Sequence, residues 1–221
     1  MKDYLKKIIV DEEIKNWHFL VLFSLVTSVV IIVSDNYIYT REFYGFIYSK
    51  KYEPTIVDFL YVSKVKFAIF KYLFVPIVIV LRVVMVSMLI QFNLMIRVIE
   101  IPFRKIMRIS LLGYATLSLM PLAQMLNLLN IPIKEMTVNY LIIVPFSLAS
   151  LLNIPNINST LVSILGLINI FEVLWIVIIT FGLKAISHLT TLNSFIISFS
   201  VWSLFLLFQI GVILFTSQFL G

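Results

Sequence analysis

The chain contains five long apolar runs between Trp17 and Leu220, and short polar stretches separate them. The hydrocarbon core of a bilayer is about 30 Å thick, and about 20 apolar residues of helix cross it. Each run is long enough to do so. Within lipid every backbone polar group must be satisfied by the segment itself, which favours helices. The sequence therefore predicts an all-α polytopic membrane protein, a bundle of five transmembrane helices, and excludes most water-soluble folds.

The composition supports this prediction. Of 221 residues, 61% are hydrophobic and 13% are charged, whereas a soluble domain carries about 25% charged residues. There is no cysteine and there are only two histidines, so we expect no disulfide, no metal site and no cofactor. The net charge of +6 is expected to attract anionic headgroups. Nucleic-acid binding is not predicted, because no basic face with a suitable fold is visible.

The chain reads as one membrane domain, 17–221, after an amphipathic cytoplasmic tail at 1–16. A shorter apolar segment, 138–152, contains Pro145 and has about 15 residues, which is typical of re-entrant or interfacial segments. A short tilted helix is the alternative for that segment. The predicted spans cover about 17–33, 72–96, 109–129, 161–182 and 195–218.

The distribution of basic residues predicts the orientation. The tail holds four Lys or Arg residues, the 97–108 loop holds four and the 183–194 loop holds one. With five spans these segments share one side, and the positive-inside rule makes that side cytoplasmic. Six basic residues in 34–71 weaken the asymmetry. We expect a multi-pass protein of the bacterial cytoplasmic (inner) membrane with a cytoplasmic N-terminus; if 138–152 spans, the later topology inverts.

Two charged residues fall within predicted spans, Arg82 and Glu172. A charge at the bilayer centre costs about 3 kcal/mol or more, so both should face protein or water. Helical spacing places Asn93 on the stripe of Arg82 and Asn169 on the stripe of Glu172. These four residues form the predicted buried polar site. It is either a proton relay, ion path or headgroup pocket, or a structural pair that fixes helix register.

No enzyme signature is present. The sequence lacks a G-x-x-x-x-G-K-[ST] phosphate loop, an H-E-x-x-H zinc motif and a G-x-S-x-G nucleophile elbow. His188 follows Ser187, but its own loop contains no carboxylate to orient it. We therefore predict no catalytic residues and a protein that is not an enzyme.

Short motifs in the second half carry a resemblance. Gly-Tyr-Ala opens the third predicted span after the basic and aromatic residues 103–105, a proline follows, and a tryptophan and Gly-Leu-Lys-Ala occupy the fourth span and its exit. This pattern, over about 97–215, resembles the Yip family, Rab-interacting Golgi membrane proteins with many bacterial relatives. Pro121 is displaced from its usual spacing, and 99–102 replaces a Gly-rich loop. The motif positions are Gly113, Tyr114, Ala115, Pro121, Trp175 and Lys184.

The resemblance implies five spans, a cytoplasmic N-terminus and a C-terminus on the other side. Eukaryotic members of the family resemble trafficking and membrane-shaping adaptors that bind small GTPases. No catalytic residues and no role of the bacterial members carry over to this chain.

The leading hypothesis is a non-enzymatic membrane protein that organises the bilayer or binds a partner, either another membrane protein or a second copy. The predicted lipid or partner contacts are Arg97, Arg104, Lys105 and Arg108. The alternative is a permease or transporter subunit that uses the buried polar site. A third hypothesis, an intramembrane lipid-modifying enzyme, requires a polar cluster that opens laterally to lipid.

Overall fold

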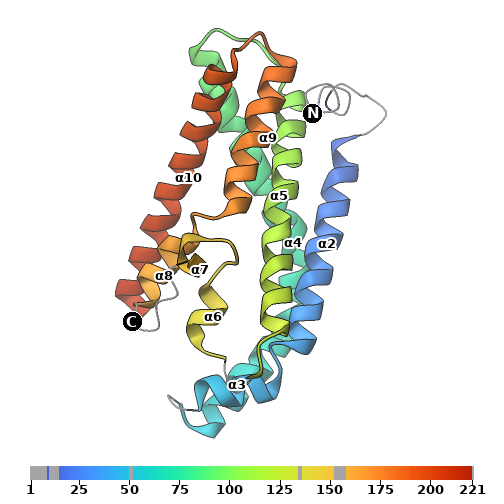
Figure 1. Cartoon of the computed structure of the whole chain (residues 1–221). Coiled ribbons are helices and arrows are strands. Elements are labelled where there is room, and N and C mark those ends of the chain that lie inside the picture. The colour runs from blue at the N-terminus through green and yellow to red at the C-terminus, as the bar shows by residue number, and fades with distance from the viewer. Residues whose placement is uncertain (1–8, 10–14, 50–51, 134–135, 152–157, 221) are drawn as a thin grey trace.

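The structure is a computed structural model, and it describes residues 9, 15–49, 52–133, 136–151 and 158–220. In this part of the chain the regular elements are helices, apart from one isolated β-bridge. Long helices lie side by side in a bundle, and short helices fill the space near one end (Figure 1). In chain order the helices are α2 (Asn16–Tyr37), α3 (Arg41–Tyr48), α4 (Pro54–Ile96), α5 (Phe103–Leu129), α6 (Val138–Ile142), α7 (Leu148–Leu151), α8 (Ser159–Gly166), α9 (Ile170–Ile186) and α10 (Thr191–Leu220).

Four helices in the described part are long and apolar enough to cross a membrane: α2, α4, α5 and α10. Their large hydrophobic side chains are often exposed, such as Leu25 at 59% and Phe208 at 67%. Apolar surface of this extent is compatible with a multi-pass membrane protein. The fifth predicted helix is not confirmed, because α9 has only 17 residues.

Helix α5 lies in the middle of the bundle and contacts α2, α4 and α9, while α10 packs on α9. The α4–α5 and α9–α10 connections lie at the end of the bundle where α2 begins (Figure 1). Helix α3 and the end of α10 lie at the opposite end. The structure thus places the α4–α5 and α9–α10 connections at the same end of the bundle, as the distribution of basic residues predicted. Which end is cytoplasmic stays a prediction.

Two glycines allow α5 and α9 to pack closely. A Cβ atom added at Gly113 would lie 2.8 Å from Cδ1 of Ile179, and one added at Gly182 would lie 2.6 Å from Cγ2 of Ile109. Real Cβ atoms do not approach other atoms so closely, so an added methyl group must displace its neighbour: at Gly113 that neighbour is the movable end of the Ile179 side chain, and at Gly182 it is the less movable branch of Ile109. A Cβ atom added at Gly166 would have its nearest neighbour at 3.7 Å, which is an ordinary contact.

The predicted loop 97–108 is too long. Helix α5 already begins at Phe103, directly after Pro102. Proline is tolerated at the start of a helix because the first N–H groups have no partner within the helix. The basic residues from Arg104 to Arg108 therefore lie on the first turns of α5 rather than in a loop.

The predicted span 161–182 is not one continuous helix. The helix breaks between α8 and α9, at residues 167–169. There the backbone pairs with the segment before α7: the N–H of Leu148 donates to the carbonyl of Ile168 at 3.0 Å, and that of Ile170 donates to Phe146 at 3.2 Å. These bonds satisfy backbone groups that an unbroken helix would have satisfied internally.

In the described part of segment 138–152, up to residue 151, the helices are α6 and α7, of five and four residues. Neither helix alone can cross a membrane, which needs about 20 residues. The predicted tail helix at 1–16 lies mostly outside the described residues.

The glycines give a stability prediction with a matched control. Gly182→Ala should lower the free energy of unfolding by about 1–3 kcal/mol, the usual effect of overpacking. Gly211→Ala places the same methyl group on α10, where nothing lies within 4 Å, and should leave stability equal or slightly higher. Thermal unfolding in one detergent checks both variants. Equal melting temperatures would show that the α5–α9 contact is loose.

Candidate functional site

Two charged side chains meet inside the bundle. Nη2 of Arg82 on α4 lies 3.4 Å from Oε1 of Glu172 in the first turn of α9. The Arg82 side chain is 33% exposed and the Glu172 side chain is 14% exposed. The Glu172 carboxyl also lies close to the side chain of Trp202 on α10. The predicted pairing of these two residues is therefore present, as one long contact.

The break in the helix positions Glu172. Asn169 is the N-cap of α9, and its Oδ1 accepts a hydrogen bond from the backbone N–H of Glu172 at 3.1 Å. Its Nδ2 donates to the carbonyl of Gly166 at 3.1 Å and thereby also holds the end of α8. A carboxylate in the first turn interacts favourably with the helix dipole. Asn169 thus belongs to the site as its organiser.

A cavity of about 270 Å³ adjoins the pair. It lies where α4, α5, α10 and the segment from α6 to α9 meet, and its lining includes two charges and polar side chains between apolar ones. A cavity of this size with several polar groups in its lining, which we call the polar cavity, can hold water or a small polar group. Besides Arg82 and Glu172, the cavity lining includes Asn169, Ser163, Gln209 and Met120.

Asn93 does not belong to this site, contrary to the sequence prediction. Its Nδ2 donates to the carbonyl of Leu89 in its own helix at 2.9 Å. Arg82 and Asn93 share a helical face, but eleven residues of helix separate them by about 16 Å along the axis. A shared face alone does not bring side chains together.

Arg108 is buried rather than available to lipid or a partner. Its side chain is at the start of α5, and the residue is 3% exposed. Nε donates to Oδ1 of Asn16 at 3.0 Å, and Nη1 donates to the carbonyl of Ile9 at 3.0 Å. Asn16 in turn donates to the carbonyl of Arg104 at 3.2 Å. Arg108 therefore ties the N-terminal segment to α5, whereas Arg97, Arg104 and Lys105 are exposed.

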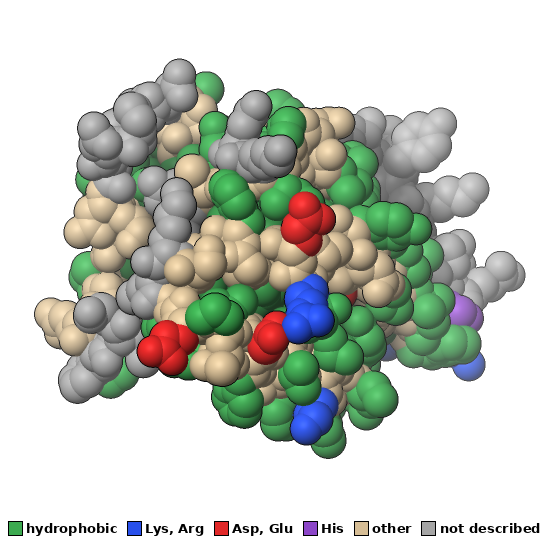
Figure 2. Space-filling view, turned by 90° about the horizontal axis from the view of Figure 1, so that it is seen from below, with side chains coloured by type: hydrophobic (Ala, Val, Ile, Leu, Met, Phe, Trp, Pro, Cys, Tyr) green, Lys and Arg blue, Asp and Glu red, His purple; other side chains and the backbone are tan. Residues whose placement is uncertain are grey.

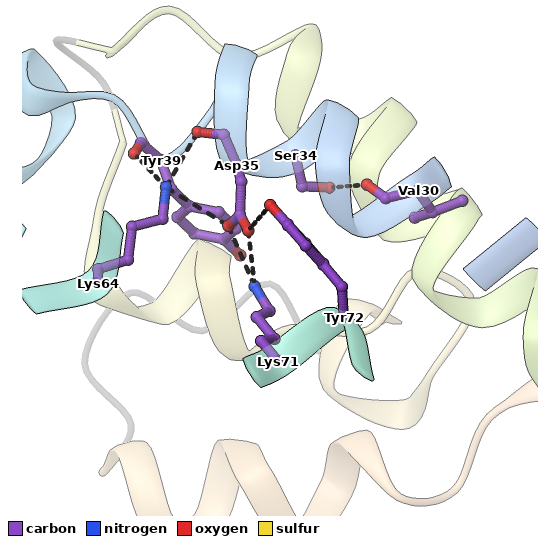
Figure 3. A network of polar contacts seen from close by, with 7 residues as sticks. All are labelled: Val30, Ser34, Asp35, Tyr39, Lys64, Lys71 and Tyr72. Carbon is purple, nitrogen blue, oxygen red and sulfur yellow. Dashed lines mark hydrogen bonds and ion pairs between the residues drawn. The ribbon is translucent and has the colours of Figure 1, made fainter. Parts of the chain in front are cut away.

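A second polar network was not predicted (Figure 3). Asp35, near the end of α2, accepts hydrogen bonds from Lys71 Nζ and from the Tyr72 hydroxyl on α4, each at 3.1 Å. Lys64 Nζ lies 3.4 Å from the same carboxylate and donates to the carbonyls of Asp35 and Tyr39 at 3.0 Å. Burial and the Asp35 charge both raise the pKa of Tyr39. Lys64 and Lys71 are seven residues apart, which places both on one helical face. This spacing is the sequence signal from which the network could have been predicted.

This network fastens the end of the bundle that carries α3. Arg41 of α3 also forms an ion pair with Asp58 of α4, at 2.8 Å between Nη2 and Oδ2. Figure 2, which views the molecule from below, shows acidic and basic side chains next to one another among hydrophobic ones. We interpret this end as a structural anchor, because the carboxylate of Asp35 is already satisfied by protein groups.

The motif positions have structural roles. Gly113 faces Trp175, which is 4% exposed. The Tyr114 ring lies 6.1 Å from that of Phe23 between ring centroids. Ala115 is partly buried, and Pro121 lies within α5 without ending it. Lys184 donates to Oγ1 of Thr191 at 2.5 Å across the α9–α10 turn.

In the described ranges no group of three or more His, Cys, Asp or Glu side chains could hold a metal ion. Comparisons with models of protein families, with curated proteins and with solved structures found no match. The resemblance to the Yip family therefore stays a prediction.

The Asp35 network gives a second stability prediction. Asp35→Asn removes the charge that two lysines and a tyrosine surround, and should destabilise the protein by about 1.5–3 kcal/mol, the range for hydrogen bonds to charged groups. Asp58→Asn, the control, breaks a pair whose side chains are 69% and 51% exposed and should change stability by less than about 1 kcal/mol. Thermal unfolding in detergent compares them. A larger effect at Asp58 would contradict this ranking.

Proposed function

We propose that this chain is a permease-type membrane protein, which binds a small polar or ionic group at the Arg82–Glu172 pair. The observation that carries the proposal is a charged pair at a break between two helices, beside a cavity of about 270 Å³. Discontinuous helices with polar groups at the break are the usual way in which transporters build a site at mid-membrane depth. This role was the alternative in the sequence analysis.

The geometry favours a binding site over a purely structural ion pair. A structural pair in a membrane should be short and fully enclosed, because unsatisfied charge is expensive there. This contact is 3.4 Å long, it uses one nitrogen of Arg82, and a third of that side chain is exposed. The guanidinium has five N–H donors, and it lines the cavity. A ligand can therefore reach both charges without dismantling the packed α5–α9 core.

We further propose that α8 and α9 together form a fifth, discontinuous crossing, with α6 and α7 re-entrant beside it. Broken backbone at membrane depth is tolerated where protein or a water-filled cavity surrounds it. Here the segments around Ser147 and Asn169 pair with each other, so protein adjoins the break. The cavity adjoins it as well. The basic residues predict that the end carrying the start of α2 is cytoplasmic.

The role in membrane organisation or partner binding has a separate support. Arg97, Arg104 and Lys105 are exposed at the end of the bundle where α5 begins. An anionic surface or an acidic partner could contact them without involving the polar cavity. This second candidate predicts that reversing these three charges weakens partner recovery and leaves ligand binding intact.

The proposed cavity should be reachable from water, and the absence of cysteine in the chain makes this testable without background. Ser163→Cys and Gln209→Cys place thiols in the cavity lining. A charged thiol reagent reacts with the thiolate, which requires water, so both variants should be modified in proteoliposomes. Mass spectrometry of the intact chain measures the extent of labelling.

Two control positions make the labelling interpretable. Ser87→Cys lies in the packed core at 0% exposure and should resist the charged reagent. Ser200→Cys lies on the exposed face of α10 and should react with a lipid-soluble maleimide but not with the charged reagent. If the two lining positions behave like Ser87→Cys from both sides of the membrane, the cavity is dry and the permease proposal is wrong.

A further inference from the structure

An apolar groove runs along the outside of the bundle between α4 and α10. Its volume is about 570 Å³, which is within the range of about 300–1,000 Å³ for ligand pockets. The side chains that form it are largely exposed, for example Met88 at 59% and Leu207 at 66%. Its lining includes Met85, Met88, Leu89, Leu204, Leu207 and Phe208.

The groove and the polar cavity lie next to each other along the same two helices. On α4, Met85 and Leu89 lie three and seven residues after Arg82, and these spacings place all three on one helical face. On α10, Phe205 lies four residues before Gln209 and therefore on the same face. The same two helices thus present an apolar groove and, one turn further along, a polar end. Such a surface is complementary to a molecule with one polar end and one long apolar part.

The polar end holds one positive and one negative charge. A purely anionic ligand that binds Arg82 would leave Glu172 unpaired, and a purely cationic ligand would leave Arg82 unpaired. Leaving one charge of this partly buried pair without its partner is unfavourable, because an uncompensated charge is expensive within a membrane protein. A ligand that carries both charges can replace both halves of the long Arg82–Glu172 contact at once. The site therefore favours a zwitterionic head.

We propose that the cavity and groove bind a zwitterionic phospholipid of the bilayer with an ethanolamine head. Its phosphate pairs with Arg82, its ammonium group pairs with Glu172, and one acyl chain lies in the groove between α4 and α10. A primary ammonium group offers three donors to a carboxylate, whereas the quaternary amine of a choline head offers none. This inference rests on the proposed function, and it names the class of molecule that the site takes.

Competition between lipids tests the inference. The full chain is purified in detergent and given equal amounts of phosphatidylethanolamine, phosphatidylcholine and phosphatidylglycerol with identical acyl chains. Native mass spectrometry counts the lipid retained on the protein. We expect phosphatidylethanolamine to be retained about tenfold over each of the others, the ratio that 1.4 kcal/mol supplies. Equal retention of the three lipids would mean that chains simply coat the groove, and would overturn the inference.

Variants separate the contributions of head and chain. Arg82→Met with Glu172→Gln removes both charges without leaving one unpaired, and should abolish the preference while the protein stays folded. Met88→Trp narrows the groove and should reduce retention of phosphatidylethanolamine. Met95→Trp is the matched control, because Met95 lies further along α4, is 66% exposed and does not line the groove. If both tryptophan variants retain the lipid equally, the groove does not hold the chain.

A soluble competitor distinguishes this inference from the proposed function. Glycerophosphoethanolamine carries the same zwitterionic phosphodiester head without acyl chains, and it should displace the lipid only at concentrations at least about a hundredfold higher. If it competes as well as the lipid, or if no lipid is preferred while Ser163→Cys is labelled from water, the groove is not part of the site. In that case the polar cavity still serves a soluble solute. If the cavity thiols are unlabelled as well, both proposals fail.

Discussion

The close contact between α5 and α9 determines where the charged groups of this protein lie. Gly113 leaves room for the side chains of Ile179 and Trp175, and Gly182 leaves room for the side chain of Ile109. Helix α9 is thereby fixed from its exit back to its first turn. Since Glu172 lies in that turn, the glycine contact also fixes the carboxylate opposite Arg82.

The charged side chains inside the bundle differ in how completely protein groups satisfy them. Arg108 donates to an amide oxygen and a backbone carbonyl, so its role is to hold segments together. Asp35 is enclosed by two lysines and a tyrosine hydroxyl. The contact of Arg82 with Glu172 is longer and borders a cavity. A charge whose hydrogen bonds are already made by protein groups has little capacity left for a ligand, and this difference supports the proposal that a ligand binds at Arg82 and Glu172.

Hydrophobic length and periodicity predicted the helical bundle, and the expense of charge in lipid predicted that Arg82 and Glu172 would meet. Asn169 followed three residues later by Glu172 was an available signal of a helix start, but hydropathy alone did not reveal the break before α9, because Leu167 and Ile168 are as apolar as the helices. The break depends on pairing with the distant segment at Phe146 and Leu148. Asp35 was missed for the same reason, since its partners are about thirty residues away in the chain.

Helix α4 contains 43 residues, so its length of about 64 Å is roughly twice the hydrocarbon thickness. It carries Lys71 of the Asp35 network near one point and Arg82 at another, with Pro76 between them. Proline removes a backbone hydrogen bond and makes a helix easier to bend. The ion pairs of Asp35 and Asp58 hold α4 on one side of Pro76, and Arg82 lies on the other side, so a bend at the proline would change the position of the guanidinium and leave the α3 end in place.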